Sequence, residues 1–189
     1  MLAAGRSARM GIAKQTLEIP GWGTLLGNAI RQARLLSGCV SVVVGGGYPL
    51  IRYRCSQPPS RWLYCPDWEQ GMSASLATGI QALGPSALGV FVLLGDQPLL
   101  AEEGLLRLGQ RVRQAPDSVW AADYGARVGV PAWIPRRLWP QVLRLQGDVG
   151  AVRVLNQVEA NRVKIVGVDL DVDTPARWQK IKQVLAEQA

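Results

Sequence analysis

The chain has 189 residues, of which 48% are hydrophobic and 19% are charged, and it contains no histidine. This length and composition suit one soluble domain with its own core. The lack of histidine excludes Ser-His and Cys-His nucleophilic catalysis and any zinc site that needs an imidazole ligand. No apolar run approaches the roughly 20 residues that span a bilayer, and no leader sequence is visible. We therefore expect a cytoplasmic protein without a membrane segment, in which Cys39, Cys55 and Cys65 are free thiols.

The net charge of +7 is concentrated near the N-terminus. Residues 1–61 hold eight basic residues against the single acid Glu18, so the remainder of the chain is neutral overall. A local basic excess indicates an anionic ligand. Because aromatic residues are few in this segment and no nucleic-acid motif is present, we expect a small phosphorylated ligand and no nucleic-acid partner.

Short apolar runs alternate with segments of helical periodicity. In chain order, we expect a helix over 24–36, a strand over 39–44, a helix over 72–83, a strand over 88–94, a helix over 101–113, strands over 119–122 and 163–168, and a closing helix over 174–187. The alternation predicts one α/β domain, a Rossmann-like three-layer sandwich with a mostly parallel sheet. The region 124–157 is richer in Gly, Pro and Trp, and we expect it to be irregular and to face a substrate. In such folds ligands lie at the carboxyl ends of the strands.

Two segments have the composition of phosphate or nucleotide sites. In LAAGRSARM (2–10), small residues let the backbone approach a phosphate, and Arg9 and Lys14 are close enough to clamp it. The same composition also suits a flexible, solvated N-terminus. In PDWEQGMSASL (66–76), a glycine and two hydroxyls at a helix start can seat a polar ligand on free backbone amides. On these residues alone, ordinary helix capping is the better explanation.

Two further segments carry carboxylates after predicted strands. Asp96 in GDQP (95–98) follows the strand at 88–94, where it can ligate Mg²⁺, although Asp and Pro also favour simple turns. In DLDVDTP (169–175), the two-residue period of an extended chain places Asp171 and Asp173 on one face, where one of them can supply a second metal oxygen. Alternatively, Asp173 or Thr174 caps the final helix, which Pro175 opens.

Together these segments resemble the molybdenum cofactor cytidylyltransferase family, part of the Mg²⁺-dependent nucleotidyltransferases with a Rossmann-like fold. LAAGRSARMGIAK is similar to the phosphate-binding signature of that group, and its LAAG form is typical of the cytidylyl branch. LLGDQP matches the family's metal-binding DQP. The segments PDWEQGMSASLATGI, GVPAWIP, LQGDVGA and DVDTP resemble further blocks in the expected order. The resemblance therefore covers nearly the whole chain.

The resemblance implies an enzyme that transfers CMP from CTP to molybdopterin and releases pyrophosphate. The product is the cytosine dinucleotide cofactor used by xanthine-dehydrogenase-like enzymes, one of which would be the protein partner. It implies catalytic roles for Arg9, Lys14 and Asp96; nucleotide binding by Leu2, Ala3, Ala4, Gly5, Arg9, Lys14, Gly71 and Ser73; a metal, Mg²⁺ or alternatively Mn²⁺, on Asp96 and Asp173; and acceptor binding by Gly129, Pro131 and Asp148.

The sequence departs from the family pattern at a few positions. Relatives carry a hydrophobic strand before LAAG, so we expect a trimmed chain start, with apolar residues missing upstream of Met1. Val130, Cys65 and the segment 149–152 replace more polar or basic residues. Two alternatives stay open: a sister nucleotidyltransferase with another nucleotide or acceptor, such as guanylyl transfer, or a non-catalytic carrier of the molybdenum cofactor.

Overall fold

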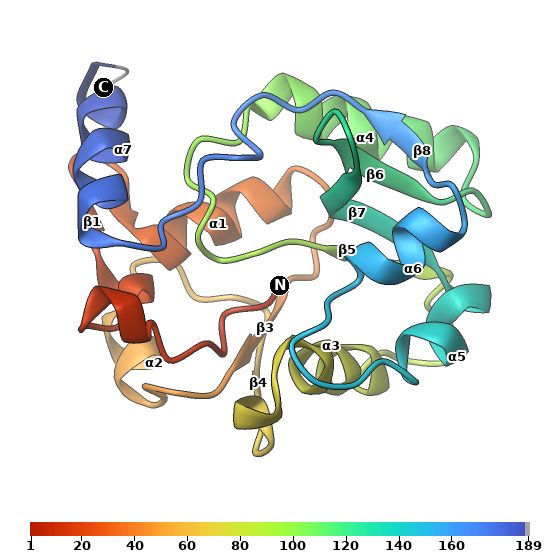
Figure 1. Ribbon diagram of the computed structural model, residues 1–189, viewed down its shortest axis with the longest axis horizontal. Coiled ribbons are helices and arrows are strands. Elements are labelled where there is room, and N and C mark those ends of the chain that lie inside the picture. The colour runs from red at the N-terminus through yellow and green to blue at the C-terminus, as the bar shows by residue number, and fades with distance from the viewer. Residues whose placement is uncertain (188–189) are drawn as a thin grey trace.

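The computed structural model describes residues 1–187 and shows helices on both sides of a central sheet (Figure 1). The helices are α1 (Leu25–Arg34), α2 (Leu50–Arg54), α3 (Met72–Gln81), α4 (Glu102–Gln114), α5 (Trp139–Val142), α6 (Val152–Gln157) and α7 (Pro175–Glu187). The strands are β1 (Glu18–Ile19), β2 (Gly23–Thr24), β3 (Ser41–Val44), β4 (Arg61–Tyr64), β5 (Gly89–Val92), β6 (Trp120–Asp123), β7 (Val128–Pro135) and β8 (Asn161–Val163). Within 1–187, no helix is long and apolar enough to cross a membrane.

The N-terminal residues join two groups of strands into one sheet. β3 pairs in parallel with β4, and a second group has the order β5-β7-β6-β8. Leu2 bridges the two groups because it pairs in parallel with Val43 on one side and with Leu94 on the other. β7 is antiparallel to β5 and β6, whereas β8 is parallel to β6. The predicted α/β class is confirmed, with a mixed sheet in which β7 alone runs in the opposite direction.

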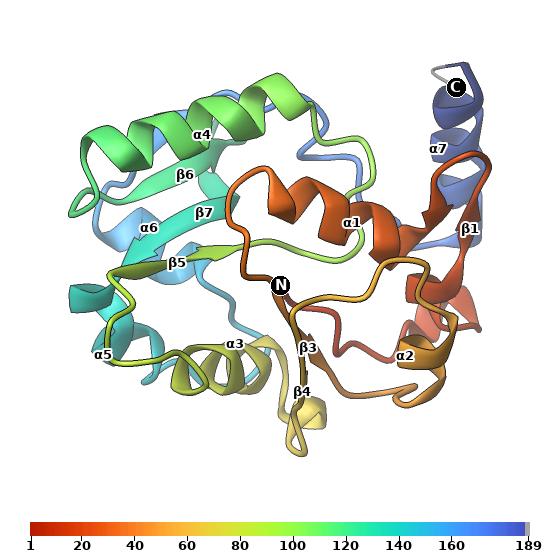
Figure 2. The same cartoon turned by 180° about the vertical axis from the view of Figure 1, so that it is seen from behind.

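Side-chain alternation along the strands builds one core on each face of the sheet. On one face, α3, α5 and α6 pack against residues such as Val92 and Ile134. On the other face, visible in Figure 2, α1 covers Val42 and Val44, and α4 covers Trp133. This arrangement leaves the loops at the carboxyl ends of the strands free to form a site.

The predicted helices agree with the structure to within a few residues. α1 begins after Thr24, whose hydroxyl accepts a hydrogen bond from the Gly27 N–H at 3.1 Å. α7 begins at Pro175 and is capped by the Thr174 hydroxyl, which accepts from the Arg177 N–H at 3.3 Å. The predicted strands at 39–44, 88–94 and 119–122 correspond to β3, β5 and β6.

Two sequence-based expectations are wrong. The predicted strand at 163–168 continues β8 only as far as Val163, since the chain then turns over 166–169. Gly167 lies in that turn with φ 88°, and a Cβ there would overlap the carbonyl oxygen of Leu99. Within the segment 124–157, expected to be irregular, residues 128–135 form the longest strand of the sheet, and all eight are buried.

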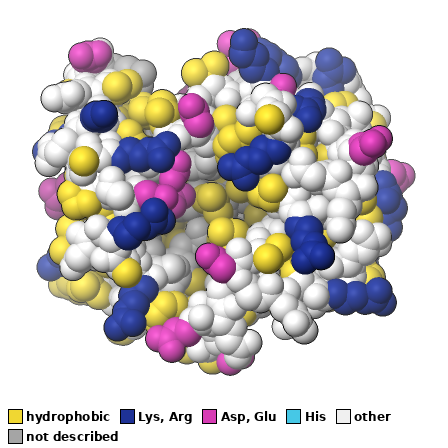
Figure 3. All heavy atoms as spheres, viewed as in Figure 1, with side chains coloured by type: hydrophobic (Ala, Val, Ile, Leu, Met, Phe, Trp, Pro, Cys, Tyr) yellow, Lys and Arg dark blue, Asp and Glu magenta, His cyan; other side chains and the backbone are white. Residues whose placement is uncertain are grey.

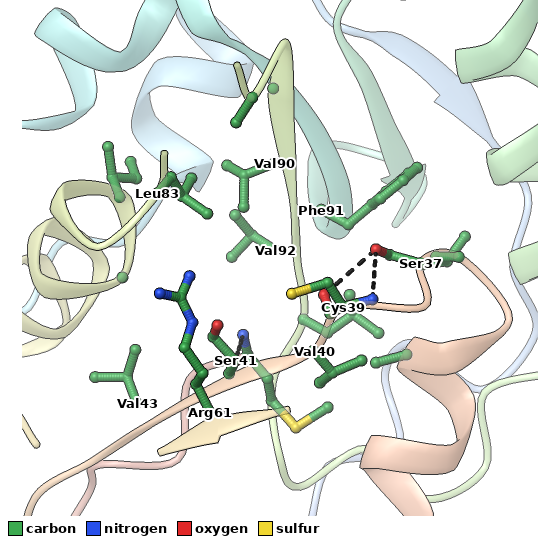
Figure 4. A pocket seen from close by; sticks show the side chains of 18 of the residues that line it. Ser37, Cys39, Val40, Ser41, Val43, Arg61, Leu83, Val90, Phe91 and Val92 are labelled. Atoms are coloured by element: carbon green, nitrogen blue, oxygen red, sulfur yellow. Dashed lines mark hydrogen bonds between the residues drawn. The ribbon is translucent and has the colours of Figure 1, made fainter. Parts of the chain in front are cut away.

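Residues 1–4 run between β3 and β5, where Leu2 bridges to both sides, and they fill only part of the space between these strands. The Met1 amine donates to the Ser41 carbonyl oxygen at 2.9 Å, and above it lies a cavity of about 490 Å³. Figure 4 shows Val90 and Val92 of β5 bordering this cavity. The Leu93 carbonyl faces the N-terminal segment, where it accepts from the Leu2 N–H. Successive residues of a strand direct their backbone N–H and C=O groups to opposite sides, so those of Phe91, two residues earlier, point into the cavity. The cavity has the environment of an interior strand position.

A short strand fused before Met1 is expected to fill this cavity. About four β-branched residues should raise the Tm by roughly 5 °C, because they pair free backbone groups and bury apolar side chains. A Gly-Ser fusion of equal length is the control, and both proteins are compared by thermal denaturation. Equal Tm values for the two fusions would contradict the expectation.

The same fusion should change the pH dependence of stability. Burial lowers the pKa of the Met1 amine from 8.0 to about 6. Between these values the unfolded chain binds more protons, so the free energy of unfolding of the 1–189 chain rises from pH 6 to pH 8, by roughly 2 kcal/mol. Denaturant titrations should show that the fused protein lacks this component.

Candidate active site

A cleft of about 850 Å³ opens at the carboxyl ends of the central strands. On the face drawn in Figure 3, basic and acidic side chains surround a hollow near the middle of the molecule. Of the predicted site residues, the cleft is lined by Leu2, Ala3, Ala4, Gly5, Arg9, Lys14, Gly71, Asp96, Asp148 and Asp173. Residues from the two ends of the chain and from its middle therefore meet in one place.

The centre of the cleft is an ion-pair cluster around Lys14. Its Nζ donates to Asp96 Oδ2 at 2.6 Å and to Asp173 Oδ1 at 3.1 Å. Arg9 adds a contact to Asp173 Oδ2 at 3.2 Å, although its own side chain is 71% exposed. The Val172 N–H donates to the Asp96 carbonyl oxygen at 2.9 Å, so backbone pairing fixes the two acidic segments beside one another.

The charges of this cluster shift the pKa values of its members. Burial acts to lower the pKa of Lys14, but the charges and hydrogen bonds of Asp96 and Asp173 outweigh it and raise that pKa. Partial burial acts to raise the pKa of Asp173, but hydrogen bonds from Asp171 and Lys14, with the charges of Lys14 and Arg9, lower it overall. Partial burial raises the pKa of Asp171, and its neighbour Asp173 adds to the effect.

The phosphate-binding loop expected at residues 2–10 is held in place by a buried glutamine. Gln15 is 3% exposed, and its Nε2 donates to the carbonyl oxygens of Ala3 at 2.9 Å and Gly5 at 3.1 Å. Its Oε1 accepts from the Ser7 hydroxyl at 3.3 Å, and Ser7 adopts a left-handed conformation with φ 56°. The loop is therefore ordered, unlike the flexible terminus that was the alternative. Sequence reasoning missed Gln15, whose only signal was its place beside Lys14.

The acidic residues of the cleft match the coordination that Mg²⁺ or Mn²⁺ prefers. Asp96 Oδ1 is buried and has no hydrogen-bond partner among the described residues, so it is free to bind a cation. No group of three His, Cys, Asp or Glu side chains within 1–187 forms a complete protein cage. Mg²⁺ is typically bound by one or two carboxylates together with substrate phosphates and waters. Asp96 and Asp173 fit that pattern.

Only one of the three predicted acceptor-side residues lines the cleft. Asp148 lines the cleft, whereas Gly129 packs under the Tyr124 ring and Pro131 is buried in β7. Neither Gly129 nor Pro131 lines the cleft. Ser73, a predicted nucleotide ligand, instead donates its hydroxyl hydrogen to the Gly147 carbonyl oxygen at 2.8 Å, so its hydroxyl proton is already committed.

Sequence reasoning also missed three residues on the strand side of the cleft. Tyr124 and Arg127 line it, and the Arg127 guanidinium carbon lies 5.4 Å from the centre of the Tyr124 ring. The Tyr124 hydroxyl donates to the Val130 carbonyl oxygen at 2.7 Å and accepts from Gln97 Nε2 at 3.0 Å. Gln97 of the GDQP motif also lines the cleft, but it is only 2% exposed and supports the Tyr124 hydroxyl.

Comparisons with known proteins identify the class as nucleotidyltransferase. The model of the "MobA-like NTP transferase domain" matches residues 1–163. The purine catabolism protein PucB of Bacillus subtilis strain 168 is 31% identical over 200 residues, covering 98% of this chain and 95% of its own length. The chain belongs to the MobA-like NTP transferase family, whose substrates are nucleotides.

Solved structures agree with this assignment. The crystal structure of the Mycobacterium tuberculosis Rv0371c homologue from Mycobacterium sp. strain JC1 has a TM-score of 0.84 at 28% identity, covering 100% of this chain and 96% of the other. The Rv0371c structure in complex with manganese has a TM-score of 0.79 at 27% identity, with coverages of 96% and 95%.

Replacing Lys14 by Met should destabilise the protein at neutral pH by about 1–3 kcal/mol, because two partly buried carboxylates lose their cation. The lowered pKa of Asp173 means that its stabilisation is present above its ordinary value of 3.8 and is lost as the pH falls through the folded-state pKa. The cost should therefore shrink in acid. Denaturant titrations at pH 7 and below pH 4 measure it, with Lys182→Met on the exposed side of α7 as the control. An equal cost at both pH values would contradict this account.

Proposed function

We propose that the protein transfers CMP from CTP to the terminal phosphate of molybdopterin. The acceptor phosphate oxygen forms a bond to the α-phosphorus of CTP, the bond between the α-phosphorus and the bridging oxygen breaks, and pyrophosphate leaves. Such a transfer needs positioning and charge neutralisation more than covalent help from the protein. The product would be the cytosine dinucleotide form of the cofactor.

The observation that carries the proposal is the meeting of the N-terminal loop, Lys14, Asp96 and Asp173 in one cleft. The loop would hold the triphosphate on its backbone amides, with Arg9 and Lys14 neutralising the phosphate charge. Asp96 and Asp173 would hold the divalent cation, Mg²⁺ or Mn²⁺, which stabilises negative charge on the reacting phosphates when bound.

The acceptor side would lie across the cleft from the loop. Asp148 and Arg127 both line the cleft, and Arg127 offers a cation to an anionic acceptor. Gly129 and Pro131 would act only from behind, by placing Tyr124 at the surface of the cleft. The relative PucB is named for purine catabolism. That name agrees with a cofactor delivered to a xanthine-dehydrogenase-like enzyme, since xanthine is a purine.

Pyrophosphate release with Mg²⁺ and molybdopterin, compared for CTP, GTP and ATP, tests the proposal. We expect release with CTP and a loss of about 100-fold or more in kcat for Asp96→Asn, because the site loses a carboxylate that holds the cation. Asp117→Asn is the matched control, since Asp117 is exposed and remote from the cleft.

Each other outcome points to a different function. Release with GTP alone would contradict cytidylyl transfer and indicate a guanylyl-transferring sister enzyme. Binding of molybdopterin without release from any nucleotide would favour a cofactor carrier. Unchanged release by Asp96→Asn would overturn the metal-binding role of Asp96.

A further inference from the structure

Lys14 lies between the same carboxylates that would bind a divalent cation. Its Nζ contacts Asp96 Oδ2 at 2.6 Å and Asp173 Oδ1 at 3.1 Å, and the three side chains are 15%, 17% and 26% exposed respectively. A single ammonium thus already bridges two acidic segments that are far apart in the sequence. One carboxylate oxygen, Asp96 Oδ1, stays without a partner within the described residues.

The cluster is close to electrically neutral before any ligand binds. The charges of Lys14 and Arg9 balance those of Asp96 and Asp173. A divalent cation that approaches the two carboxylates therefore meets an ammonium in contact with both of them. At such short range and with partial burial, repulsion between like charges is weakly screened. The affinity of the free protein for a divalent cation at Asp96 and Asp173 is therefore expected to be low.

The Lys14 side chain can reach a second set of anionic partners while its backbone stays in place. The backbone N–H donates to the Ser7 hydroxyl oxygen at 3.3 Å, and Lys14 opens a short 3-10 helix. The flexible four-carbon stem of a lysine can swing its ammonium without moving the backbone. The neighbouring loop with Gly5 lines the same cleft, so triphosphate oxygens bound there would give the ammonium new anionic partners.

We infer that, in the free protein, the Lys14 ammonium occupies the place of the divalent cation between Asp96 and Asp173. The cation therefore binds weakly without nucleotide, and nucleotide and cation bind cooperatively. The inference rests on the proposed function only in that the ligand is a nucleoside triphosphate. Binding linkage is reciprocal, so a cation in the site also raises nucleotide affinity by the same factor. Lys14 would thereby prevent the two acids from capturing a cation before the substrate arrives.

Mn²⁺ binding to the free protein, followed by electron paramagnetic resonance, tests this inference without any turnover. Lys14→Met should bind Mn²⁺ about tenfold more tightly than the natural chain, within the usual range of coupling between sites. Lys14→Gln is a second neutral variant, in case the first folds poorly. Lys14→Arg keeps the charge, and Lys182→Met removes a charge elsewhere. Both should bind Mn²⁺ as weakly as the natural chain.

A double variant tests whether the tighter Mn²⁺ binding of Lys14→Met takes place at Asp96. Asp96→Asn combined with Lys14→Met should abolish the tighter binding. Lys14→Met and Lys14→Gln that bind no more tightly than Lys182→Met would overturn the inference, and so would a gain that survives Asp96→Asn.

Added CTP separates this inference from the proposed function. Water-proton relaxation enhancement distinguishes protein-bound manganese from the manganese–CTP complex. For the natural chain, CTP should raise the affinity for Mn²⁺ about tenfold, and for Lys14→Met by much less. A tighter Lys14→Met without any response to CTP in the natural chain would contradict nucleotide binding. The proposed function and the cooperative part of the inference would then fail, while the blocking role of Lys14 would stand.

Discussion

Backbone hydrogen bonds made by residues 1–4 hold the sheet together. The Leu2 N–H donates to the Leu93 carbonyl and the Ala3 N–H to the Val43 carbonyl, while Gly95 and Val43 donate in return. Without this segment, the pair β3-β4 would have no strand contact with the group β5-β7-β6-β8. Because interior backbone groups must find partners, this short stretch decides whether the domain has one sheet or two.

The geometry of the cleft follows from that central position. The chain leaves the middle of the sheet directly into the loop that Gln15 braces, so the loop lies over the carboxyl ends of β3 and β5. Asp96 follows the adjacent strand, and Val172 pairs with its carbonyl oxygen, which brings Asp173 alongside. The loop and the two acids are thus positioned by hydrogen bonds of the Gln15 side chain and of the Val172 backbone.

The sequence predicted most of the fold because local signals and tertiary packing agree in it. It failed where they differ. In β7, two prolines argued against a strand, yet Pro131 lies where β6 and β7 shift register between Ala121 and Ala122, so its missing N–H breaks no ladder bond. At 163–168, Val163, Ile165 and Val168 are core residues beside α4, but only Val163 belongs to a strand and Val168 lies in a turn. Periodicity cannot distinguish that arrangement from a continuous strand.

For the cleft, the sequence predicted many of the residues that line it but not how they neutralise one another. Lys14 and its acidic partners are 82 and 159 residues apart, a separation that no local pattern reports. The basic excess of residues 1–61 suggested an open anion site, yet Arg31 pairs with Glu102, and Lys14 and Arg9 pair with acids from the neutral remainder. The charge that meets an incoming ligand is therefore set by tertiary pairing. Under our proposal, a phosphate ligand would compete with the carboxylates for these cations, and that competition would link nucleotide binding to the release of Asp96 and Asp173.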